Sequence, residues 1–257
     1  MNIKKAIEKI VSPEISKYGF NFIGKKDSLS WRYSKEKDDF HQYITFTRSQ
    51  FDLNCIRIEF STSLNEMDIV YGSQLILDSK YLDRGFWRFS DERSLESTLQ
   101  ILKNLIIEKG IECLDILSIP ILKPSADASK ILLSVDNKKQ RAERFATEQK
   151  LDFSIESLLI LERNIETQKS NRDDVDWEYI FESSIYFGEV TINQFNGEWR
   201  WDERQQTTVI GSIAGKQITV APLLHVTRFW GNPKRSSYSL FKIINDIDQV
   251  IKLTLNN

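Results

Sequence analysis

Five side chains in the C-terminal half of this chain have the types and density expected of a recognition surface. They are Glu189, Trp199, Trp201, Arg228 and Trp230. Tryptophan and arginine bury large areas and make directional contacts, which is why they dominate the binding energy of protein interfaces. We therefore expect these five residues to bind a partner, and a protein is the partner that suits such a surface.

The same residues also have a structural interpretation. Trp199 and Trp201 lie two positions apart, so on a strand both would point to one face, where paired aromatic residues usually serve the core. Glu189 could pair with a backbone amide or with Arg200. The exposure of these side chains decides between a surface and a core.

A carboxylate-dependent enzyme of the hydrolase or nuclease type is the alternative function. Glu189, Asp202 and Arg228 are the group suited to it, and they would have to converge in a pocket. The chain lacks the glycine-rich phosphate-binding patterns and the Gly-x-Ser-x-Gly nucleophile elbow, so no catalytic residue is identified. A magnesium site made only of carboxylates remains an alternative at Asp38-Asp39 or Asp173-Asp174, although such runs of charge are usually solvated.

Residues that favour transition metals are few. His41, His225, Cys55 and Cys113 are the only histidines and cysteines, and no two of them are close in the sequence. Because a metal site needs converging ligands, we expect neither a metal nor a cofactor. The histidines are expected on strands or loops with ordinary hydrogen bonds. The cysteines are expected as buried free thiols, as in the reducing cytoplasm.

The charge balance argues against nucleic acid as a partner. Lys plus Arg number 35 and Asp plus Glu number 37, so no net field attracts the molecule to a phosphate backbone or an anionic membrane. Local binding of a nucleic acid is a weaker alternative, in which the phosphate backbone and a base would contact Arg228, Lys234, Arg235 and Trp230. No apolar run approaches the roughly 20 residues that cross a bilayer. The first ten residues lack the apolar core of a secretory signal, so a cytoplasmic location is expected.

Periodicity predicts a helix, an antiparallel meander and a second helix in a first unit of residues 1–122. Apolar residues at helical spacing mark the N-terminal segment, in which Pro13 either kinks the helix or starts a second piece. From Phe20 to Ser63 apolar and polar residues alternate with the period of strands that have one solvated face. Helical spacing returns at Asp91, and Gly110 is expected as the C-cap of that helix.

A boundary is expected between Pro120 and Ala128, where prolines and small residues break the periodicity, and it leaves a second unit of residues 123–257. The helices expected there cover residues 138–149, 154–167 and 237–253, and helical spacing also recurs through Trp177, Phe181 and Ile185. The short strands cover 198–202, 207–210 and 217–220. The Asn196-Gly197 pair is a strong turn signal before the first of these strands. The expected fold class is therefore α+β, with two layered units that each pack an antiparallel sheet with helices.

Two stretches resemble bacterial families. The first carries Ser16-Lys17-Tyr18-Gly19-Phe20, Trp31-Arg32-Tyr33 and Phe86-Trp87-Arg88-Phe89 before a helix, and it resembles the bacterial domain-of-unknown-function family 4304. The second, with Tyr186-Phe187-Gly188-Glu189 and Gly197-Glu198-Trp199, looks like uncharacterised domains found among toxin-immunity proteins. These resemblances imply a fold and a bacterial setting, and they transfer no site residues.

The expected function is that of a non-catalytic cytoplasmic binding protein of the immunity type, which inhibits a protein toxin. Such inhibitors act by occlusion and by electrostatic complementarity, so they need no catalytic machinery.

Overall fold

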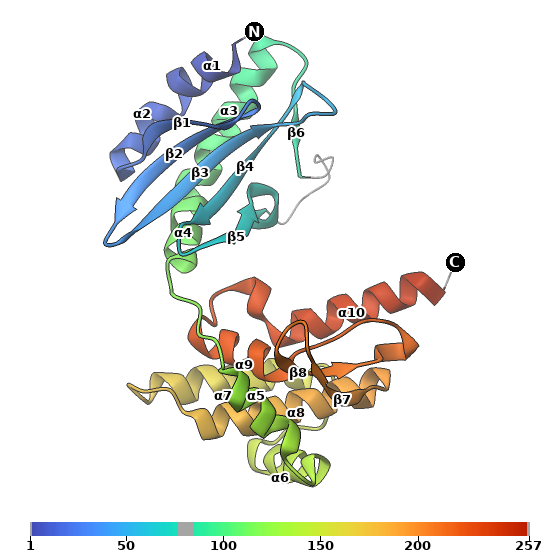
Figure 1. The fold of residues 1–257 in the computed structure, drawn as a ribbon. Helices are drawn as coiled ribbons and strands as arrows, with labels where there is room; N and C mark the ends of the chain where they lie inside the picture. The colour runs from blue at the N-terminus through green and yellow to red at the C-terminus, as the bar shows by residue number, and fades with distance from the viewer. Residues whose placement is uncertain (1, 77–84, 256–257) are drawn as a thin grey trace. The chain divides into compact units, whose positions relative to one another are not determined.

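The computed structural model describes residues 2–76 and 85–255 of the chain (Figure 1). The chain divides into two compact units, Met1–Pro120 and Ile121–Asn257, where the sequence places a boundary after residue 122. The chain combines helices with antiparallel strands, which confirms the expected α+β class. Each unit is described by itself.

The first unit begins with a helix in two pieces. α1 (Ile3–Ile10) is followed by α2 (Ser12–Ile15), and Pro13 occupies the first turn of α2, where a missing N–H interrupts no helical hydrogen bond. Pro13 therefore starts a second helical piece, which is one of the two expected alternatives. Gly19, at φ +89°, ends the following 3-10 turn η1 (Ser16–Tyr18) in a conformation that glycine adopts without strain.

A six-stranded antiparallel sheet follows, in the order β1-β2-β3-β4-β5 with β6 paired to β4. The strands are β1 (Asn21–Asp27), β2 (Ser30–Lys37), β3 (Phe40–Arg48), β4 (Cys55–Thr62), β5 (Asn65–Tyr71) and β6 (Trp87–Arg88). The first four strands form the predicted meander, whereas the sequence pattern did not indicate β5 and β6. Ile44 and Phe46 of β3 are buried in the core, and Thr45 between them points to the opposite face of the sheet.

One long helical segment packs on the apolar face of this sheet. It runs through α3 (Glu92–Leu105), the π-helical turn η3 (Ile106–Gly110) and α4 (Ile111–Leu117), and Figure 1 shows α3 crossing behind the strands. The expected C-cap at Gly110 is wrong, because helical backbone continues through it at φ −67°. A Cβ at Gly110 would lie 2.5 Å from Cε1 of the buried Phe60 ring, so glycine here permits a close approach of helix to sheet.

The second unit is mainly helical. Its helices are α5 (Ala126–Ser134), α6 (Lys138–Gln149), α7 (Ser157–Ser170), α8 (Trp177–Phe195), α9 (Pro222–Gly231) and α10 (Leu240–Leu255). The small residues at Ser125 to Ala128, expected to break the structure, instead start α5. Ser125 Oγ accepts the N–H of Ala128 at 3.0 Å, and Leu132 one turn later is fully buried.

The cap at Ser125 yields a prediction for stability. Ser125→Ala should lower the free energy of unfolding of the second unit by about 1 kcal/mol, because the N–H of Ala128 loses its acceptor. Ser125→Asp retains an acceptor and should leave stability close to that of the wild type. Urea unfolding monitored by amide hydrogen exchange in α5 measures both. Equal stability of the alanine and aspartate variants would contradict the capping role.

A two-stranded antiparallel sheet, β7 (Glu198–Asp202) and β8 (Thr207–Gly211), packs on these helices. The predicted strand at residues 217–220 is wrong except for Val220, which forms a single bridge with Ile210. After this bridge the chain enters α9, which begins at Pro222.

The expected C-terminal helix is present as α10. Among residues 2–76 and 85–255, no helix has the length and apolar character needed to cross a membrane.

Candidate functional site

Glu189 and Trp199 lie together inside the second unit. Glu189, on α8, is 8% exposed, and its Oε1 accepts the indole N–H of Trp199 at 2.8 Å. The Trp199 ring packs on Gly188, where a Cβ would come within 2.2 Å of Cζ2. Lys138 Nζ lies 5.5 Å from the centre of the same ring, and burial lowers the pKa of Lys138 while the Glu189 charge opposes that shift. This cluster joins β7 to α8, so it has a structural role.

The remaining predicted residues lie in different surroundings. Trp230, on α9, is 2% exposed, and its ring centroid lies 6.3 Å from that of Tyr179. Burial therefore removes Trp230 from the predicted recognition surface. Trp201 and Arg228 are half-buried, and the Arg228 guanidinium lies 5.9 Å from the ring centre of Tyr238. A contact between these two residues and a partner stays a prediction.

The three groups of the alternative enzyme site are engaged separately in the described part of the chain. Glu189 accepts from Trp199, as described above. Asp202 Oδ1 accepts the N–H of Gln205 at 2.9 Å in the turn that joins β7 to β8. Arg228 lies on α9 beside Tyr238. The three groups therefore have different partners, and an acid–base role for them stays a prediction.

The two histidines differ in their surroundings. His41 is exposed on β3, with its Nδ1 3.5 Å from Ser34 Oγ, which fits the expected strand position. His225 was expected on a strand or loop but lies on α9, with its ring edge-to-face against Phe187. Burial lowers the pKa of His225 to about 4, and the charge of Arg228 adds to the shift. The His225 imidazole is therefore neutral at pH 7.

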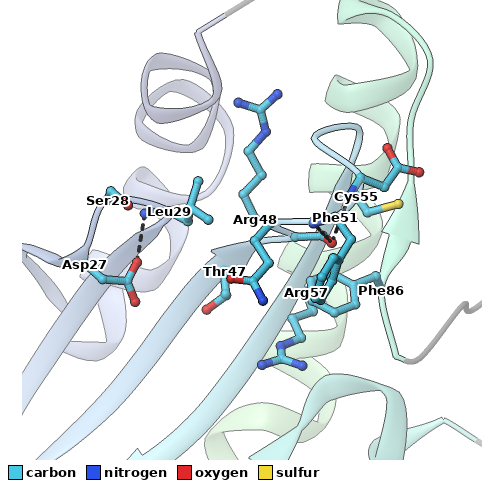
Figure 2. Close-up of a pocket in the computed structure, with 12 residues that line it drawn as sticks. Asp27, Ser28, Leu29, Thr47, Arg48, Phe51, Cys55, Arg57 and Phe86 are labelled. Atoms are coloured by element: carbon cyan, nitrogen blue, oxygen red, sulfur yellow. Dashed lines mark hydrogen bonds between the residues drawn. The ribbon is translucent and has the colours of Figure 1, made fainter.

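A cavity of about 600 Å³, here called the sheet cavity, lies in the first unit. Several of its lining residues come from strand positions that alternate with core positions, so it opens on the face of the sheet opposite the core. Figure 2 shows Asp27 and Leu29 at one side of the cavity and Phe51, Arg57 and Phe86 gathered at the other. The cavity is large enough for a side chain of a partner or for a small ligand.

Arg57 forms the fixed polar wall of the sheet cavity. Its Cζ lies 4.5 Å from the ring centre of Tyr71 and 4.6 Å from that of Phe86, and its Nη2 lies 2.9 Å from Glu59 Oε1. Glu59 is only 6% exposed, so it compensates the guanidinium charge at close range. The cavity thus offers hydrogen-bond donors beside aromatic faces, without a strong net positive charge.

The thiol of Cys55 lines the sheet cavity but is not activated. Burial raises the pKa of Cys55, and the neighbouring Asp52 raises it further while Arg88 lowers it. Asp52 accepts the N–H of Asn54 at 2.9 Å, and this hydrogen bond lowers the pKa of the Asp52 carboxyl. A protonated, buried thiol is a poor nucleophile, so a covalent reaction at Cys55 is not supported. Cys55 and Cys113 are both buried and neither is in a disulfide, as predicted.

The rim of the sheet cavity is an ordered loop, residues 49–54, that presents Phe51 to solvent. Ser49 Oγ accepts the N–H groups of Phe51 and Asp52, each at 3.2 Å, and the Arg48 guanidinium donates to the carbonyl of Leu53. These bonds hold the loop while the Phe51 side chain stays 84% exposed. A large apolar side chain held in water beside a cavity is typical of an interface anchor.

Sequence reasoning assigned none of these residues to a site. The available signal was the polar half of the alternation in β3 and β4, which includes Thr47 and Arg57. These two residues are direct partners in the strand register, and Phe86 contacts Arg57 from a more distant part of the chain. A sequence without a known register does not bring them together.

Among residues 2–76 and 85–255, no group of three or more His, Cys, Asp or Glu side chains is arranged to hold a metal ion. Comparisons of the chain with models of protein families, with curated proteins and with solved structures find no match. The assignment of a function therefore rests on the geometry of the chain itself.

Proposed function

We propose that this chain is a non-catalytic cytoplasmic protein that binds a protein partner on the sheet cavity and the adjoining loop 49–54. The observation that carries the proposal is the 84% exposure of Phe51 on an ordered loop at the rim of the cavity. Leu53 on the same loop is 52% exposed, so the anchor has an apolar neighbour. Two buried cysteines that form no disulfide, Cys55 and Cys113, are in keeping with a reducing compartment.

The chemistry of the sheet cavity indicates what the partner supplies. Arg57 offers charge-assisted donors, Phe86 offers an aromatic face, and Asp27 stands at the opposite wall. A partner side chain with both an apolar body and hydrogen-bonding atoms would fill this space, while Phe51 packs on the partner from the rim. An inhibitor of the immunity type would use these contacts to cover the working surface of a toxin.

The first test is capture of the partner from the native cell with three baits. The wild-type chain and the Ile131→Ser variant should retain the same protein, because Ile131 is a 58% exposed apolar residue of the second unit, on α5. Phe51→Ser should bind that protein at least about 30-fold more weakly, since loss of an aromatic anchor typically removes 2 kcal/mol or more.

Stability supplies the control for this experiment. Phe51 is exposed, so Phe51→Ser should change the free energy of unfolding by no more than about 0.5 kcal/mol. Equal retention of the partner by all three baits would refute the proposed surface. Inhibition of a captured toxin by the wild-type chain, and its loss in Phe51→Ser, would establish the immunity role. Binding of the captured protein without inhibition of its activity would show that the partner is not a toxin that this chain inhibits.

A further inference from the structure

The sheet of the first unit has a second face, opposite the one on which α1 and α3 pack (Figure 1). We call it the open face and define it by five side chains that alternate with core residues along β2, β3 and β4. They are Arg32, Tyr43, Thr45, Arg57 and Glu59. Arg57 also lines the sheet cavity, so the open face continues from the proposed partner surface.

Arg32 is held in a fixed position on the open face. Its Cζ lies 4.6 Å from the ring centre of Tyr43, and its Nε donates to Thr45 Oγ1 at 3.2 Å. Thr45 is the direct partner of Arg32 in the strand register and is only 1% exposed, so this hydrogen bond lies low on the sheet. The flat side and one edge of the guanidinium are therefore used within the chain.

The outer edge of the same guanidinium is unused. Nη1 and Nη2 of Arg32 have no hydrogen-bond acceptor among the residues that the structure describes, and neither nitrogen is buried. Because Tyr43 and Thr45 already fix the plane of the group, little side-chain entropy is lost when these nitrogens bind an acceptor. Arg32 thus presents N–H donors to solvent in a fixed plane.

The charge of Arg32 is not compensated, in contrast to that of Arg57. Glu59 Oε1 accepts the Nε–H of Arg57 at 2.9 Å and lies at the same distance from its Nη2. Glu59 shares a row of the register with Arg32 through Thr45, but its carboxylate is engaged by Arg57. In residues 2–76 and 85–255, no carboxylate forms an ion pair with Arg32. The open face therefore has one balanced and one unbalanced guanidinium.

We propose that Arg32 binds the carboxylate of an aspartate or glutamate side chain of the protein partner. The two oxygens of a carboxylate lie in one plane and match Nη1 and Nη2 in a bidentate pair, which is the geometry that arginine recognises best. The half-buried position of Arg32 reduces screening by water, so the opposite charge of the partner is felt at close range.

This inference rests on the proposed function, because it extends the partner surface from the sheet cavity onto the open face. The Ser30–Thr47 pair is two residues from the Arg32–Thr45 pair in the register, and Thr47 lines the sheet cavity. Arg32 is therefore about 7 Å from the cavity wall along the strand direction. An interface of standard size covers roughly 800 Å² on each partner, which is enough to include both places.

The first test is selection of random-sequence peptides, displayed on phage, against immobilised wild-type chain, Arg32→Gln and Lys35→Gln. Peptides retained by the wild type should be enriched in aspartate and glutamate relative to the unselected library. Lys35 is the matched control, since it lies on the same strand with its Nζ 5.8 Å from the ring centre of the core residue Phe20. Lys35→Gln should keep the enrichment and Arg32→Gln should lose it. No acidic enrichment on the wild type, or equal enrichment on Arg32→Gln, would refute the proposal.

A double-mutant cycle with one acidic peptide from the wild-type selection measures the contact itself. Replacing the peptide carboxylate by the corresponding amide should weaken binding to the wild type about tenfold or more, because a charge-assisted bond is lost. The same replacement should have little effect on binding to Arg32→Gln. Arg32→Lys should bind the acidic peptide more weakly than the wild type, since an ammonium group lacks the planar fork.

The cycle also separates recognition from folding. A merely structural role of Arg32 would make Arg32→Gln weaken the acidic peptide and its amide form alike. In that case the amide replacement would cost the same in both backgrounds, and the proposed carboxylate contact would be wrong.

Phe51→Ser distinguishes this inference from the proposed function when the captured partner is tested. Weaker binding by both Phe51→Ser and Arg32→Gln would support both. Weaker binding by Phe51→Ser alone would reject the carboxylate contact and keep the partner surface. Unchanged binding by Phe51→Ser would reject the partner surface, and with it this extension.

Discussion

Gly188→Ala is expected to lower the free energy of unfolding of the second unit by about 3 kcal/mol. A Cβ at this position would lie 2.2 Å from Cζ2 and 2.3 Å from Cη2 of Trp199, so the indole must move. That movement would break its 2.8 Å hydrogen bond to the buried Glu189. This change in stability has the opposite sign to the usual effect of Gly→Ala, because alanine in a helix interior is normally favoured over glycine by about 0.5–1 kcal/mol.

A double-mutant cycle with Trp199→Leu separates crowding from other causes. Trp199→Leu should itself destabilise the unit, because Glu189 loses its donor. In the Trp199→Leu background, however, Gly188→Ala should have little effect or should stabilise α8. Hydrogen exchange of the α8 amides measures the local free energy in all four proteins. A penalty for Gly188→Ala of the same size in both backgrounds would show that Trp199 is not the cause.

Between pH 6.5 and pH 4 the second unit is expected to lose about 3 kcal/mol of stability through His225. The folded pKa of His225 is lowered to about 4 from an ordinary value of 6.5, mainly by burial. In this window the unfolded imidazole binds a proton and the folded one does not, so stability falls as the pH falls. Above pH 6.5 and below pH 4 His225 carries the same charge in the folded and unfolded states, so it does not contribute to the pH dependence of stability there.

Urea unfolding at pH values from 4.5 to 7.5 measures this effect. His225→Gln should flatten the pH profile of stability, since glutamine does not titrate. Arg228→Gln should raise the folded pKa of His225, because the Arg228 charge contributes to the shift. The pH range over which His225 lowers stability should then be narrower. A His225→Gln profile as steep as that of the wild type would assign the acid sensitivity to other groups.

Local patterns predicted much of the secondary structure. The alternation through Trp31 and Tyr33 in β2 reports burial on one face, and burial on a strand repeats every two residues whatever its neighbours are. The sequence also predicted the new helical piece at Pro13, because the missing N–H of proline is a local property. It predicted the charged helix α6 (Lys138–Gln149) as well, because helical periodicity is likewise a property of the local chain.

The predictions from the sequence that the structure did not match have non-local causes. Gly110 resembles a helix end in sequence, but the Phe60 ring from β4 lies where its side chain would be, so the glycine serves packing inside a continuing helix. Trp230 has the residue type of an interface anchor, yet it is buried beside Tyr179. Residue type alone did not distinguish an exposed aromatic from a buried one, because exposure depends on the partner element.

The sequence by itself determined the α+β class and most helices and strands, because periodicity and turn chemistry act over a few residues. It also predicted two buried free thiols. Only the tertiary structure decided which side chains meet, as Phe51, Arg57 and Phe86 do at the sheet cavity. These groups come from separate elements, so their convergence depends on strand register and helix packing, which no single stretch of sequence contains.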